Sequence, residues 1–220
     1  MPVACLIVSE IAADVLGTRC DVLAEAWEWW ARALSGLAPE DWERPTRLPE
    51  WDVHALVAHH ALIVGALPAL ASAAVDADPT VPTARDMLRG FNAPDGAAHT
   101  LAPRIAGLAR KQAEAQPPSA LVERFAVDAP ASVAVVRRAG PVILDYFGNG
   151  LFPLAEVLSI AILEAVVHGL DLVRAVALPP EPPAAALAHA VGLLASLADP
   201  VAFAEAATGR TAAVVLPVLR

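Results

Sequence analysis

Glu164 and His168 stand four residues apart in the apolar stretch 162–172, which reads Ile-Leu-Glu-Ala-Val-Val-His-Gly-Leu-Asp-Leu. On an α-helix this spacing brings two side chains to one face, with their Cβ atoms roughly 5–6 Å apart. A carboxylate and an imidazole at that separation can bind one metal ion, and Asp171 falls on the same stripe. The pair makes only half of a metal site, so a third ligand must come from another segment.

The third ligand is expected near the other histidines. Three of the six histidines lie in the segment 54–60, at the start of a second strongly apolar stretch. The three- and four-residue spacing of its apolar positions includes His60 and turns that side chain toward the core. His59 lies about 100° around the helix. The pattern does not choose between the two as a ligand, and a lone histidine in such a place is more often a hydrogen-bonded core residue.

A solvent-exposed face is the alternative interpretation of the stripe 164, 168 and 171, which Arg174 would continue by one turn. Nearly every other direction around this helix is apolar. A helix that is apolar nearly all round is buried, and a buried carboxylate needs a partner. We therefore expect Glu164 to be buried and partnered.

The remaining periodicity predicts a helix bundle. From residue 13 the apolar positions alternate steps of four and three, as in a packed helix seam, and they include Cys20 as a small buried hydrophobe. Asp52 suits the N-terminal cap of a second helix, and Pro153 suits the first turn of a later one. Proline-rich loops separate the further expected helices, which cover about 52–74, 83–91, 100–115, 153–178 and 184–197.

Other segments are less regular. The Val- and Ile-rich segments 132–136 and 141–147 suit short strands or a loop with one strand-like edge, and the segment 212–216 predicts a strand. We expect an all-α fold, a four-helix bundle with an extra C-terminal helix in residues 1–198, followed by a short tail, 199–220. Such bundles build metal sites from side chains on facing helices.

Composition and charge exclude several classes of partner. The net charge is −9, and no cluster of Lys and Arg exceeds a pair, which argues against nucleic acid and against an anionic membrane. Mean hydropathy is +0.54, but there is neither an uninterrupted apolar run of membrane-spanning length nor a signal peptide. The two cysteines make no disulfide framework. We expect a cytoplasmic protein, and a homodimer is compatible with the sequence.

Two segments, in order, resemble the mycothiol-dependent maleylpyruvate isomerase family of the DinB-like metalloenzyme superfamily. Residues 37–46 and 49–59 are similar to its N-terminal signature, approximately Leu-x-x-x-x-Trp-x-x-Pro-Thr and then Pro-Gly-Trp-Thr-Val-x-x-Leu-Val-Ala-His-Leu. Residues 164–172 are similar to its Glu-x-x-x-His-Gly-x-Asp-Leu motif. The resemblance runs from about residue 13 to residue 183 and implies a DinB-like four-helix bundle.

The resemblance implies a ligand set of His59, Glu164 and His168, since the family's ligands are the His of Val-Ala-His and the Glu and His of the later motif. Asp171 would then contact a ligand or support the fold. Among the departures, His60 replaces the usual Leu, and Glu50 replaces the usual Gly.

The C-terminal part also departs from the family. The chain after Pro200 is much shorter than the second domain of the founding isomerase, so the tail 199–220 is interpreted as its reduced remnant. The pair Gly209-Arg210 resembles a Gly-Arg of the family's C-terminal segment. Arg210 and His60 are therefore candidate substrate-binding residues, with a surface role as the alternative for Arg210.

Two histidines and one carboxylate leave zinc an open fourth position, which is typical of a catalytic site. The resemblance implies mycothiol as the thiol that loses its proton beside the metal and becomes the nucleophile. We expect an enzyme that uses a low-molecular-weight thiol together with zinc or another divalent metal. Its reaction would be S-transfer to a small electrophilic substrate or isomerisation of that substrate. We prefer transfer, because the C-terminal portion is reduced. The alternatives are a metal-dependent hydrolase or lyase without thiol, an iron(II) site, and a non-catalytic metal-stabilised bundle that binds a partner.

Overall fold

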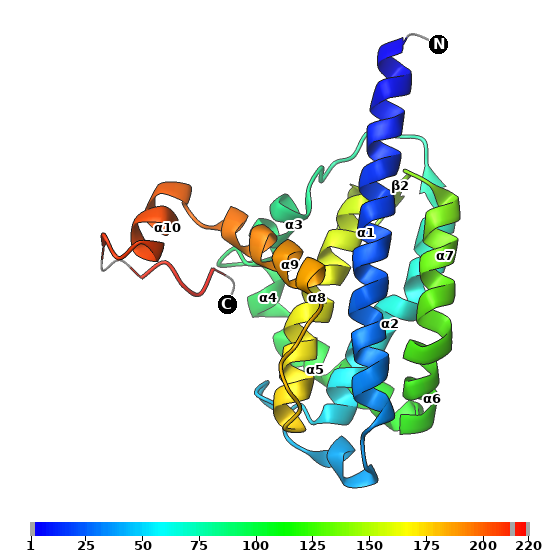
Figure 1. Ribbon diagram of the computed structural model, residues 1–220, viewed down its shortest axis with the longest axis vertical. Helices are drawn as coiled ribbons and strands as arrows, with labels where there is room; N and C mark the ends of the chain where they lie inside the picture. The colour runs from blue at the N-terminus through cyan, green and yellow to red at the C-terminus, as the bar shows by residue number, and fades with distance from the viewer. Residues whose placement is uncertain (1–2, 212–213, 219–220) are drawn as a thin grey trace.

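The computed structural model describes residues 3–211 and 214–218, and it has the expected all-α bundle at its centre (Figure 1). Four helices form the bundle: α1 (Val3–Ser35), α2 (Val53–Ser72), α7 (Ala129–Ala139) and α8 (Leu154–Ala175). Both α1 and α2 pack against both α7 and α8, so the four close into a ring around one core. The prediction of a four-helix bundle is confirmed.

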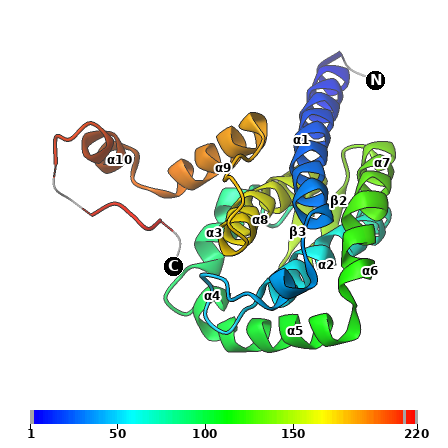
Figure 2. The ribbon, with the colours of Figure 1, turned by 60° about the horizontal axis from the view of Figure 1, so that its bottom comes forward.

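Shorter elements surround this bundle. The helices are α3 (Ala84–Phe91), α4 (Ala97–Thr100), α5 (Ala102–Ala115), α6 (Pro118–Glu123), α9 (Ala184–Leu197) and α10 (Pro200–Ala207), with a 3-10 turn η1 (Pro39–Glu43) and a π-helical turn η2 (Arg124–Asp128). The strands β1 (Ala74–Val75), β2 (Ile143–Asp145) and β3 (Leu151–Pro153) form one antiparallel sheet in that order. Seen from the end of the bundle, α5 lies alongside α2, and α9 lies on the side of α8 (Figure 2).

The seam of α1 is buried as its spacing predicts. Its buried side chains, each at most 2% exposed, are Leu16, Cys20, Leu23, Trp27, Trp30 and Leu34. Cys20 is a free, buried cysteine, which agrees with its interpretation as a small core residue. The aromatic part of this seam faces α8 and α2 at the level of the candidate site.

The two site-bearing helices begin where their capping residues predict. The Asp52 carboxylate accepts a hydrogen bond from the backbone N–H of Ala55 at 2.7 Å, which caps α2. Helix α8 follows Pro153 and carries Glu156 in its first turn and Arg174 in its last, both favourable to the helix dipole. In Figure 1 α2 and α8 run in opposite directions, so the beginning of α2 lies beside the end of α8.

Residues 132–136, for which the sequence suggested a short strand or a loop, are helical. They form part of α7, and their buried side chains, Ser132, Val133 and Val136, follow a helical spacing rather than alternation. The Ser132 hydroxyl donates to the carbonyl of Val64 at 2.7 Å and so joins α7 to α2. The second segment, 141–147, does contain a strand, β2.

The strand predicted over 212–216 is wrong for the residues that are described. Residues 214–217 have no regular secondary structure, and residues 212 and 213 lie outside the described part of the chain. A strand needs an edge to pair with, and Val214 and Leu216 are instead exposed. The tail begins with α10, because Asp199 caps it and Pro200 occupies its first turn.

Helix α2 alone, among the described helices taken singly, is long and apolar enough to cross a membrane, and α9 with α10 meets the same test only as a pair bent by 118°. Half of the apolar window of α2 is buried inside the bundle, and a buried core helix meets the test equally well.

Candidate metal centre

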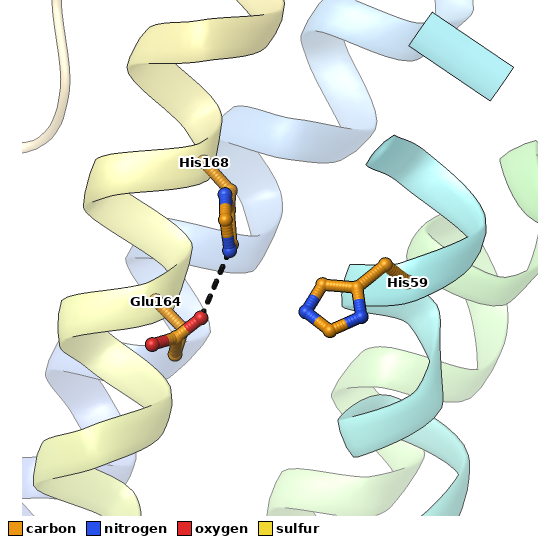
Figure 3. A group of neighbouring side chains, drawn as sticks. All are labelled: His59, Glu164 and His168. Carbon is orange, nitrogen blue, oxygen red and sulfur yellow. Dashed lines mark ion pairs between the residues drawn. The ribbon is translucent and has the colours of Figure 1, made fainter. Parts of the chain in front are cut away.

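His59, Glu164 and His168 face one another between α2 and α8 (Figure 3). Each offers one ligand atom, and the three atoms all lie within 4.8 Å of one another. On α8, Nε2 of His168 lies 2.9 Å from Oε2 of Glu164. The His59 ring comes from α2, perpendicular to the His168 ring, with the ring centroids 5.4 Å apart. The structure thus brings together the residues that the spacing and the family resemblance selected separately.

The helix arrangement explains this meeting. Glu164 and His168 share one face of α8 because they are one turn apart. His59 is in the second turn of α2, and His168 is two turns from the end of α8. Since the two helices are antiparallel neighbours, these positions lie at the same level of the bundle.

The donor set fits a divalent metal ion. Imidazole and carboxylate are zinc ligands at about 2.0–2.2 Å, so in a tetrahedral site two ligand atoms lie about 3.3–3.6 Å apart. The three atoms here lie within 4.8 Å of one another, so the side chains would close around the ion by up to about 1 Å. Three protein ligands also leave an open position, which is the arrangement of catalytic zinc sites.

The site is accessible from outside. The Glu164 side chain is 41% exposed, more than the sequence led us to expect, and the His168 side chain is 14% exposed. The stripe nevertheless is not a solvent face, because Leu154, Val157 and Ala161 on it are buried. Glu164 therefore marks the point where an otherwise buried stripe opens to solvent, as a site for a small molecule requires.

The protonation of the three residues is set by their mutual contacts. Burial disfavours a charged His168, but its hydrogen bonds and charge interactions with Asp171 and Glu164 outweigh burial and raise its pKa to about 9. Burial likewise opposes the charge of Glu164, yet the His168 contact lowers its pKa to about 2. Burial, aided by the positive charge of His168, lowers the pKa of His59 to about 4. At neutral pH His59 is therefore neutral, and the other two form an ion pair.

The His60 ring packs in the core, with its centroid 6.4 Å from that of His168. It is 2% exposed, its Nε2 accepts a hydrogen bond from Nε1 of Trp27 at 3.3 Å, and its ring stacks on Trp30 at 4.5 Å. Burial lowers its pKa to about 3. The helical pattern was right that His60 faces the core, and these contacts make it a packing residue. Contact of His60 with a substrate stays a prediction.

Asp171 lies on the other side of His168. Its Oδ2 is 3.5 Å from Nδ1 of His168, and its Oδ1 accepts hydrogen bonds from Nε and Nη2 of Arg47. Asp171 thus contacts a candidate ligand, which is one of the two roles that the resemblance implied for it. Arg47 was not singled out by sequence reasoning, and no local pattern links it to a residue 124 positions later.

Arg210 is not brought to the other candidates. It is exposed, it follows α10, and its described hydrogen bonds go to Glu205 and Thr208 in the same segment. Figures 1 and 2 show α10 extending away from the bundle. A role for Arg210 in substrate binding stays a prediction.

Trp51, an aromatic residue that the sequence did not mark as functional, lies against two of the three candidate ligands. It packs edge-on against His59 at 4.8 Å and stacks on His168 at 6.1 Å. Tyr146 packs against Phe147 and Phe152, and burial together with the negative charge of Glu164 raises its pKa. The signals available for Trp51 were its place in the family signature over 49–59 and its position next to the helix cap Asp52.

Close packing against helix α1 explains why a glycine, Gly169, follows His168. A Cβ atom at this position would lie 2.2 Å from Cζ3 of Trp29 and 3.0 Å from Nε1 of Trp30. The Trp30 indole also donates to the carbonyl of Ala165 at 2.8 Å. Helix α1 therefore approaches α8 closely beside the candidate ligands, and only glycine leaves room for it.

Comparison with known proteins shows the family of this chain. The sequence model described as the mycothiol maleylpyruvate isomerase N-terminal domain matches residues 23–173, more than half of the chain, and the match includes both motifs and all three clustered residues. No curated protein and no solved structure gives a significant match.

Proposed function

Because the chain belongs to the mycothiol maleylpyruvate isomerase N-terminal domain family, we propose that it is a metal-dependent enzyme that uses a low-molecular-weight thiol, mycothiol, on a small electrophilic substrate. The observation that carries the proposal is the convergence of His59, Glu164 and His168 within 4.8 Å at a partly exposed point of the bundle. Zinc is the metal that we favour, because two histidines and one carboxylate are a catalytic zinc set.

A zinc ion held by these residues would supply the positive charge that lowers the pKa of a thiol beside it and keeps its sulfur nucleophilic at neutral pH. The protein's own groups prepare that site. His59 is neutral because of its lowered pKa, so its free nitrogen is available without loss of a proton. Glu164 carries the negative charge that balances the metal.

The surrounding residues restrict the two imidazoles. Trp51 contacts both His59 and His168, which limits rotation of the rings. Asp171 faces Nδ1 of His168, which leaves Nε2 as the nitrogen directed toward Glu164.

Two reactions share the same first step, the formation of a bond between sulfur and an electrophilic carbon. In the isomerase reaction the thiolate adds to one carbon of the C=C bond, and the π electron pair moves to the conjugated carbonyl. Rotation about the resulting C–C single bond and departure of the thiolate re-form the double bond as the trans isomer and regenerate the thiol. If another group leaves instead with the electron pair of its bond, the product is a thioether. The family description names the first reaction, and the second remains the transferase form of the proposal.

Thiol dependence tests the proposal. The zinc-loaded protein is given maleylpyruvate or a chlorinated electrophile, with and without mycothiol, and turnover is followed by absorbance and free thiol by a colorimetric reagent. We expect turnover only with thiol and zinc, and its loss in Glu164→Gln. His99→Gln, at an exposed histidine outside the site, is the matched control and should keep full activity. Equal turnover without thiol would replace the proposal with the hydrolase alternative.

A further inference from the structure

Arg47 connects the loop before α2 with helix α8. Its Nε and Nη2 both donate to Oδ1 of Asp171, at 3.0 and 2.5 Å. Two N–H groups of one rigid guanidinium hold a carboxylate in one orientation. The Asp171 side chain is only 7% exposed, whereas that of Arg47 is 60% exposed, so a surface residue fixes a buried acid.

The second oxygen of Asp171 is left for His168. Oδ2 lies 3.5 Å from Nδ1 of His168, and this buried nitrogen has no hydrogen-bond partner within the described part of the chain, so Oδ2 is the acceptor placed to receive its proton. The opposite ring nitrogen, Nε2, is the one that faces Glu164. A histidine that donates Nδ1–H to a carboxylate keeps the lone pair of Nε2 free for a metal.

We propose that Arg47 is a positioning residue of the metal centre: it fixes the Asp171 carboxylate against Nδ1 of His168 and so holds Nε2 of that ring toward the ion. The inference rests on the proposed metal-binding function. It adds to the centre a residue that belongs to neither of its helices.

Hydrogen bonds hold together the loop that carries Arg47, and the same loop contacts the candidate ligands through Trp51. Both the backbone N–H and the hydroxyl of Thr46 donate to the carbonyl of Trp51, each at 2.9 Å, so residues 46–51 form a closed turn. The Trp51 ring then packs against His59 and His168. One hydrogen-bonded loop therefore contacts both candidate histidines through Trp51 and reaches His168 a second time through the Arg47–Asp171 pair.

A double-mutant cycle on zinc affinity tests the inference. The dissociation constant is measured at neutral pH by competition with a chromophoric chelator for wild type, Arg47→Gln, Asp171→Asn and the double variant. Loss of a carboxylate that orients a ligand typically weakens metal binding about 10- to 100-fold. We expect that loss for Asp171→Asn and about a tenfold loss for Arg47→Gln. Because Arg47 acts through Asp171, the double variant should bind within about twofold of Asp171→Asn alone.

Arg110→Gln is the matched control. Arg110 forms the other ion pair of this loop, from its Nη1 to Oε2 of Glu50 at 2.7 Å, and it contacts no candidate ligand among the described residues. Its removal should leave zinc affinity unchanged.

Two results would overturn the inference: equal zinc affinity in Arg47→Gln and Arg110→Gln, or losses that multiply in full in the double variant. If Asp171→Asn does not fold, the comparison of Arg47→Gln with Arg110→Gln decides. A wild-type protein that binds no zinc would instead refute the proposed function, before the role of Arg47 is reached.

Discussion

His59 and His60 are adjacent in the chain and both lie near His168, with ring centroids 5.4 and 6.4 Å from its ring, yet the two rings have different partners. The His59 ring faces His168 and Glu164 across the bundle, and the His60 ring accepts a hydrogen bond from Trp27 inside the core. Adjacent side chains on a helix diverge by about 100°, so one turn of α2 can serve the candidate site and the core at once. This separation allows the two roles to be tested independently.

Replacement of His60 by Leu, the usual residue of the family at this position, should destabilise the protein without removing its metal. Leu fills a similar volume but leaves the buried Trp27 N–H without its acceptor, which costs about 1–3 kcal/mol. Chemical denaturation of the metal-free protein measures the change. An unchanged free energy of unfolding would show that the Trp27–His60 hydrogen bond contributes nothing to stability.

Zinc affinity should depend on pH through His168. In the metal-free protein its pKa of about 9 means that the ring is protonated at neutral pH, and a metal ion must displace that proton. The apparent affinity should therefore fall about tenfold for each unit of pH below 9, with release of about one proton per ion. His59, with its pKa of about 4, should not compete with the metal in this range.

Chelator competition between pH 6 and 8 gives the slope, and calorimetry in buffers of different ionisation enthalpy gives the proton count. An affinity that stays constant across this range would contradict the ion pair between His168 and Glu164 in the metal-free state.

Gly169→Ala should destabilise the bundle and disturb the site. The new methyl group would meet Trp29 at 2.2 Å, so α1 must move away from α8, and overpacking of this kind costs about 1–3 kcal/mol or more. Gly192→Ala on α9 is the control, because nothing lies within 4 Å of its added Cβ. Alanine is the better helix former by about 0.5–1 kcal/mol, so this control should be neutral or stabilising. Equal unfolding temperatures for the two variants would contradict the close packing at Gly169.

Elements with a regular buried stripe could be predicted from sequence. The apolar residues of α1 follow steps of three and four from Leu16 to Leu34 because one face of the helix meets the core over that part of its length. The segment 132–136 could not be decided in this way, since its valines suit a helix and a strand equally, and packing against α2 selects the helix. The predicted strand in the tail failed because the described residues there have no edge to pair with.

The candidate site was predictable only in part. The i,i+4 spacing is enough to place Glu164 and His168 together, because it depends on one helix alone. The choice of His59 over His60 needed the family motif, since α2 is apolar on most sides. Arg47 could not be found, because its contact with Asp171 depends on the path of a loop and on a residue 124 positions away. Trp51 stands in the family signature, but the signature does not show that its ring packs against His168.

The central claim, that His59 with Glu164 and His168 forms a metal centre, is tested most directly by the zinc content of three purified proteins. Wild type, His59→Ala and His60→Leu are reconstituted with zinc, freed of loose metal on a desalting column and analysed for zinc per chain. We expect about one zinc per chain in wild type and in His60→Leu, and almost none in His59→Ala, where only two ligands remain. Zinc retained by His59→Ala but lost from His60→Leu, or no zinc in wild type, would contradict it.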